Sequence, residues 1–295
     1  MKKPESARAR SIIPFAFLFF DSPLPLFLLL ALFFATSVVG VVTGSNSLIT
    51  VPAMYQFGID ARVAVATNMF GLTFMSAGGA LPFVGKGTFD RRRLPLLIAL
   101  TLAGSALGAL LVLAVSSRAM PLFISVSMLA VAVFSVATRK RQVGRDAGFA
   151  GAGERGERAG HSAGEGVSRR AEWAGYAATF ALGVYGGFFS GGYVTLLTAA
   201  YVALFRVRFV EAVATTKVVN VFSSLVATLI FMWAGLVDYR LGALLAVVMF
   251  AGAFVGARLA LRVSERHLRA VFLATVVVLA LKILLYDFLW KGIQR

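Results

Sequence analysis

The chain has 295 residues, of which 59% are hydrophobic and only 14% are charged. Because roughly a quarter of the residues of a soluble domain are charged, this composition excludes an ordinary soluble protein and indicates an integral membrane protein. The net charge of +16 comes mainly from the N-terminal tail, the middle of the chain and the ends of apolar segments. We interpret it as positive-inside charge, and we expect no nucleic-acid partner.

Apolar stretches of about 20 residues, the length that spans a bilayer as a helix, recur along the chain. A cytoplasmic tail is expected at 1–22, and the first transmembrane repeat at 23–138. The predicted helices of this first half lie at 24–43, 62–85, 93–115 and 119–138, with a shorter apolar segment at 46–57.

The middle of the chain, 139–172, is rich in Gly, Ala, Arg, Glu and Ser, so a disordered cytoplasmic linker is expected there. The second transmembrane repeat follows at 173–290, with a short tail at 291–295. Its predicted helices lie at 173–189, 209–233, 239–262 and 267–289, with a shorter segment at 192–206.

The two halves repeat each other. Both Ala64 to Thr67 and Ala212 to Thr215 read AVAT, and in that register residues 64–137 fall without a gap on residues 212–285. Internal repeats are common in membrane transporters, whose sites lie where the repeats meet. The duplication therefore predicts an all-α polytopic fold of two homologous four-helix repeats, and it favours transport as the function.

The short segments 46–57 and 192–206 are too short to span comfortably, and we expect them to be broken, re-entrant helices. The basic loop KGTFDRRR (Lys86 to Arg93) and the linker are both expected in the cytoplasm, as are both termini, in a multi-pass inner-membrane protein. Four spans in each half give the copies the same orientation. Three spans in each half, or short segments that cross fully, would invert the second copy.

Lys217, in the sequence ATTKVVN, is the strongest candidate for a site residue because it lies well inside the apolar helix 209–233. An ionisable residue at such depth faces a cavity or a partner by default, and the expected role is to hold an anion. Pairing with a helix C-terminus or snorkelling is the alternative.

Neutral hydrogen-bonding side chains surround Lys217, and some recur in the other half. They are Thr215, Thr216 and Asn220, with repeat equivalents Thr67 and Asn68. Met69 occupies the position equivalent to Lys217, so only one half carries the charge. We expect these polar residues to bind substrate, although hydrogen bonds between helices are an alternative role.

Glycine and serine clusters precede both short segments and predict helix breaks, in TGSNSLITVP (Thr43 to Pro52) and GGFFSGGYVT (Gly186 to Thr195). A helix that starts at such a break presents backbone N–H groups and a partial positive charge to an anion. The candidate binding residues here are Ser45, Asn46, Ser47, Ser190, Gly191 and Gly192. Close helix packing is the alternative explanation for the glycines.

Acidic residues and histidines are confined to loops and helix ends, for example Asp60, Asp90, Glu211 and His267. The sequence therefore predicts no carboxylate proton relay, metal site, cofactor or catalytic constellation, and we do not expect an enzyme.

Several motifs together resemble the sulfite exporter TauE/SafE family, also called the toluene sulfonate uptake permeases. They are LITVPA after a break, ATN, and in the second half ATTKVVN, AGLVDYR and GAFVGARLALR, and the resemblance covers about residues 30–288. It implies an eight-helix duplicated secondary transporter for small sulfur-containing anions.

We therefore expect a transporter of a small anion such as sulfite or a sulfonate, working by alternating access in the lipid bilayer. The alternatives are a carrier of a cation, metal or other small solute and, less favoured, a multispanning membrane enzyme. A homodimer is left open by the sequence.

Overall fold

The computed structural model describes residues 23–44, 46–81, 92–131, 168–207 and 209–259, and all regular elements in these ranges are helical. In the first half they are α1 (Pro23–Thr43), α2 (Ser47–Gln56), α3 (Ala61–Ala80), α4 (Leu94–Ala114) and a helix at Met120–Val131. In the second half they are α6 (Arg169–Phe188), α7 (Tyr193–Ala200), the π-helical turn η4 (Tyr201–Phe205), α8 (Phe209–Trp233) and α9 (Tyr239–Leu259).

The predicted helices are confirmed wherever the structure describes them. The helix expected at 267–289, both tails and most of the expected linker lie outside the described residues. One boundary differs, because α6 begins at Arg169 rather than at 173. The reason is a cap: the Ser168 hydroxyl oxygen accepts a hydrogen bond from the backbone N–H of Ala171, which satisfies one of the free donors at a helix start.

Five of the described helices are long and apolar enough to cross a membrane. They lie within α1, α3, α4, α8 and α9. Large apolar side chains such as Phe27, Trp173 and Trp233 face outward, as they do where lipid rather than water surrounds the protein. The molecule is thus a membrane protein whose described regular elements are all helical. The re-entrant placement of the short helices stays a prediction.

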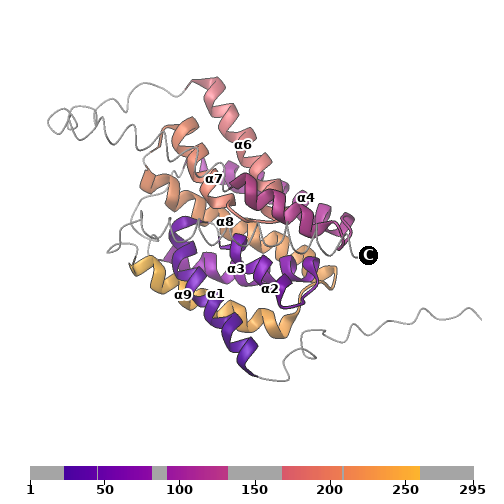
Figure 1. Ribbon diagram of the computed structural model, residues 1–295. Coiled ribbons are helices and arrows are strands. Elements are labelled where there is room, and N and C mark those ends of the chain that lie inside the picture. The colour runs from indigo at the N-terminus through magenta and orange to yellow at the C-terminus, as the bar shows by residue number, and fades with distance from the viewer. Residues whose placement is uncertain (1–22, 45, 82–91, 132–167, 208, 260–295) are drawn as a thin grey trace, which may run out of the picture.

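The helices of the two halves interleave. Figure 1 shows α3 and α8 in the middle, with α1 and α9 on one side and α4 and α6 on the other. The contacts follow this layout, because α9 packs on α1 and α3 while α4 packs on α6 and α8. Each of α4 and α9 therefore packs mainly on helices from the other half of the chain.

Glycines allow the outer helices to approach backbone to backbone. A Cβ atom on Gly108 of α4 would overlap the carbonyl oxygen of Val184 in α6, and one on Gly256 of α9 would overlap that of Val38 in α1. Such small residues are typical of tightly packed membrane helices. Close helix packing therefore accounts for Gly108 and Gly256.

Candidate functional site

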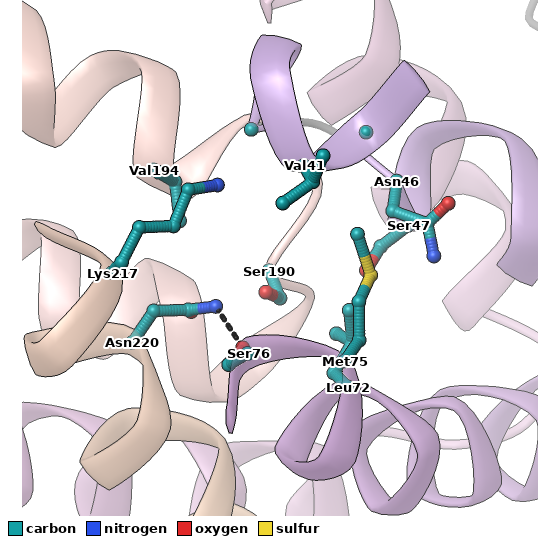
Figure 2. A pocket seen from close by; sticks show the side chains of 12 residues that line it. Val41, Asn46, Ser47, Leu72, Met75, Ser76, Ser190, Val194, Lys217 and Asn220 are labelled. Carbon is teal, nitrogen blue, oxygen red and sulfur yellow. Dashed lines mark hydrogen bonds between the residues drawn. The ribbon is translucent and has the colours of Figure 1, made fainter. Parts of the chain in front are cut away.

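A small cavity of about 20 Å³, partly open to the outside, lies where both helix breaks meet α3 and α8. Figure 2 shows it from close by. Its lining residues are Gly40, Val41, Gly44, Asn46, Ser47, Leu72, Met75, Ser76, Ser190, Val194, Lys217 and Asn220.

The two helix breaks touch each other beside this cavity. Gly44 has φ of +74°, and a Cβ atom there would lie 3.0 Å from Cβ of Val194 and 3.1 Å from the backbone nitrogen of Thr195. Ser190 adopts φ of +65° without being a glycine, a costly conformation that tends to occur at functional sites. Residues far apart in the sequence, before α2 and before α7, thus form one wall.

Lys217 reaches the cavity from α8, and its side chain is only 6% exposed. Figure 2 shows its amino group pointing into the space near Val41, above Ser190. Among the described residues, this amino group has no ion-pair or hydrogen-bond partner. A buried ammonium group without a partner is costly, so the cavity is a place where a negatively charged group would be stabilised.

Asn220 and Ser76 form a polar floor of the cavity, below Lys217 in Figure 2. The side-chain amide of Asn220 donates a hydrogen bond to Ser76 Oγ at 2.6 Å, and both residues line the cavity. This bond joins α8 to α3, and so it connects the two halves of the chain. Our sequence reasoning missed Ser76 because a single serine in an apolar helix gives no signal until the fold places it next to Asn220.

The structure brings together part of the residue set expected from the sequence. Five of these candidates line the cavity, namely Asn46, Ser47, Ser190, Lys217 and Asn220. Ser45 lies outside the described residues. The candidates Thr67, Asn68, Thr215, Thr216, Gly191 and Gly192 are described but are not among the lining residues.

Asn68 and Thr216 instead form hydrogen bonds that join the short helices α2 and α7 to the long helices α3 and α8. Thr50 of α2 donates a hydrogen bond to Asn68 Oδ1 of α3 at 2.7 Å, and the amide of Asn68 donates to Ser47 Oγ at 2.9 Å. In the other half, the hydroxyls of Thr198 in α7 and Thr216 in α8 are 3.1 Å apart. If the register predicted from the sequence is extended to the short segments, Thr50 corresponds to Thr198 and Asn68 to Thr216, which form these bonds in the two halves.

The remaining candidates have backbone or packing roles. The Thr67 hydroxyl oxygen accepts a hydrogen bond from the backbone N–H of Asp238 at 3.0 Å, just before α9. The carbonyl oxygen of Gly191 accepts from the Tyr185 hydroxyl, and Gly192 adopts φ of +79° directly before α7. The Thr215 hydroxyl is buried and has no partner among the described residues.

Chemically, the lining combines one amino group with neutral hydroxyl and amide groups on an apolar wall of Val41, Leu72 and Met75. Within the described ranges there is no group of three or more His, Cys, Asp or Glu residues that would hold a metal ion. The arrangement suits a small solute with negative charge.

Comparison with known proteins gives one family and several relatives. The family model described as "Sulfite exporter TauE/SafE" matches residues 28–283. The "Probable membrane transporter protein YfcA" of Escherichia coli (strain K12) is 28% identical over 279 residues, 92% of this chain and 93% of that protein. A "Probable membrane transporter protein" of Haemophilus influenzae is 26% identical over 226 residues, 77% of this chain and 80% of that protein. No solved structure matches the chain.

Proposed function

The chain belongs to the sulfite exporter TauE/SafE family of membrane transporters, and from that premise we propose that it carries a small, sulfur-containing anion across the cytoplasmic membrane. Sulfite or a short sulfonate is the substrate class. The anion binds in the cavity between the helix breaks, with its charge against Lys217 and its oxygens against hydroxyl and amide groups of the lining.

One observation carries this proposal, which is the buried Lys217 amino group that faces the cavity with no partner among the described residues. An ammonium group gains most from an anion where water is scarce, since the attraction between charges grows as the dielectric constant falls. The neutral groups of Asn46, Ser47 and Ser190 add hydrogen bonds from the two breaks. Broken helices that meet at a cavity are the usual place of a transporter's site.

Alternating access between the two halves is the proposed movement. The cavity lies at the contact of α3 and α8, which come from different halves and pack on each other. The hydrogen bonds that join α2 to α3 and α7 to α8 support this movement, because each helix break would then move with its own long helix. Because α9 packs with α1 and α3, and α4 packs with α6 and α8, a rocking of one of these two groups against the other opens the site to each side in turn.

A carrier of cations or metal ions is the principal rival. The charged side chain among the described lining residues is a lysine, and a positive charge repels a cation at close range. Met75 lines the cavity too, but a methionine also serves to fill apolar cores.

The test is transport by the purified protein in liposomes, with labelled sulfite and labelled methanesulfonate as solutes. We expect uptake of at least one of them above that of protein-free liposomes, and loss of that uptake in Lys217→Met. Leu225→Met is the matched control, because Leu225 lies on the same helix as Lys217 but is exposed and does not line the cavity. Movement of neither anion, or unchanged uptake in Lys217→Met, would refute the proposal.

A further inference from the structure

We propose that Lys217 carries the coupling proton, so that one proton and one monovalent anion cross the membrane together without net charge. This inference rests on the proposed function and adds the coupling ion, its stoichiometry and the charge of the substrate. It starts from the largely buried Lys217, whose unpartnered amino group lines the cavity.

Charge balance in the closed cavity is the first step of the argument. An isolated ammonium group is unfavourable in a low-dielectric interior, so a state closed to both sides favours zero net charge. Two occupancies of the cavity satisfy this condition. In one, the Lys217 ammonium group holds a monoanion, and in the other, the neutral Lys217 amine is alone.

The second step is that the described lining offers no other group to balance the charge. Lys217 is the one titratable side chain among the lining residues. The helices that pack on α8, and α8 itself at Glu211, carry other described charges, but none of these lines the cavity. Arg62 of α3 donates to Ser117 at 3.0 Å, and Arg93, just before α4, forms an ion pair with Glu172 of α6 at 3.1 Å.

Tyrosines on the elements around α8 also point elsewhere. The Tyr185 hydroxyl of α6 donates to the carbonyl oxygen of Gly191, and the Tyr201 hydroxyl of η4 accepts from Thr179 at 3.4 Å. Tyr193 of α7 is fully buried, and its hydroxyl lies near Thr101 and Ser223. None of these three tyrosines is among the cavity-lining residues.

The proton transfer balances as follows. On the side where the cavity is open, the lone pair of Lys217 Nζ takes a proton from hydronium, leaving water, and the resulting ammonium binds the anion. After the cavity opens to the other side, the anion leaves, one N–H bond breaks and its proton passes to water. The neutral amine then returns. An ammonium group without an anion does not make the crossing.

The asymmetry of the repeat sets the charge of the substrate. Met69 stands in α3 at the position equivalent to Lys217 in α8, and it is buried without lining the cavity. A second cation is therefore missing from that position. One positive charge balances one negative charge, so the site takes a monoanion.

Methanesulfonate is the probe, because it is the anion of a strong acid and brings no proton of its own. The wild-type protein is placed in liposomes containing a pH-sensitive dye, and charge movement is recorded on a supported membrane. We expect an inward proton gradient to drive methanesulfonate uptake, one proton to enter with each anion, and no current that depends on methanesulfonate.

Lys217→Arg separates binding from proton transfer, because a guanidinium group binds anions but stays protonated. We expect exchange of internal for external methanesulfonate to remain measurable in this variant. Because the guanidinium group stays charged, this variant crosses the membrane only with an anion bound, which permits exchange but not net transport. We therefore expect net uptake driven by the proton gradient, divided by exchange, to fall by about tenfold or more. If the variant also loses exchange, the number of protons that enter with each anion, and the methanesulfonate-dependent current, both measured on the wild type, test the inference instead.

Three results would overturn the inference. They are a methanesulfonate-dependent current in the wild type, a proton-driven net uptake that Lys217→Arg keeps in proportion to exchange, and a proton-to-anion ratio in the wild type that differs from one. Failure of the wild type to move either anion would instead refute the proposed function.

Discussion

Replacing Lys217 by methionine is expected to make the protein more stable while it abolishes anion binding. Lys217 is 94% buried, as its 6% exposure shows, and its ammonium group has no partner among the described residues. On insertion scales a lysine at the centre of a membrane helix costs about 2.5–3.5 kcal/mol, whereas methionine has a similar length and no charge. We therefore expect Lys217→Met to raise the free energy of unfolding by about 2–3 kcal/mol.

The same experiment has a second readout, the effect of the anion on stability. A ligand that binds only the folded wild type adds about 2.7 kcal/mol at one hundred times its Kd, and we expect no such gain in Lys217→Met. The assay is thermal unfolding in detergent, with and without sulfite. A variant that is less stable than the wild type, or that sulfite still stabilises, would refute the reasoning.

Two further substitutions test the packing. Gly108→Ala is expected to destabilise the protein by about 1–3 kcal/mol, because its Cβ would overlap the Val184 carbonyl oxygen. Gly183→Ala is the matched control at the same interface, because the nearest atom to its new Cβ would be Thr101 Cα at 3.4 Å. We expect its stability to stay within about 1 kcal/mol of the wild type. Equal melting temperatures of Gly108→Ala and Gly183→Ala would contradict the close α4–α6 contact. Asn68→Ala removes the two hydrogen bonds by which Asn68 joins α3 to α2. We expect it to lower the free energy of unfolding by about 1–2 kcal/mol, measured by thermal unfolding. An unchanged melting temperature would show that these bonds do not stabilise the protein.

The helices were predictable from the sequence because length and apolarity identify spans without any knowledge of their neighbours. Which helix packs on which was not. Gly104 and Gly108 indicate that α4 has a close partner, but nothing in the sequence says that the partner is α6, from the other half. That choice depends on matching surfaces that form only on folding.

The site was predictable in part for a similar reason. Lys217 stood out because a charge in an apolar helix has a cost that composition alone reveals. Asn68 and Thr216 gave the same polar signal as Asn220, yet they bond to the short helices, while Asn220 bonds to Ser76 at the cavity floor. A polar residue that fastens helices and one that faces a cavity look alike until their partners are placed.

The central claim, that a small anion binds in this cavity against Lys217, is tested most directly by locating a bound anion. Selenite, the selenium analogue of sulfite, gives an anomalous diffraction signal that identifies its position without reference to the surrounding chain. The account predicts a selenium peak in the cavity, with a selenite oxygen about 2.7–2.9 Å from Lys217 Nζ. A peak elsewhere in a crystal of transport-competent protein, with none beside Lys217, would contradict it.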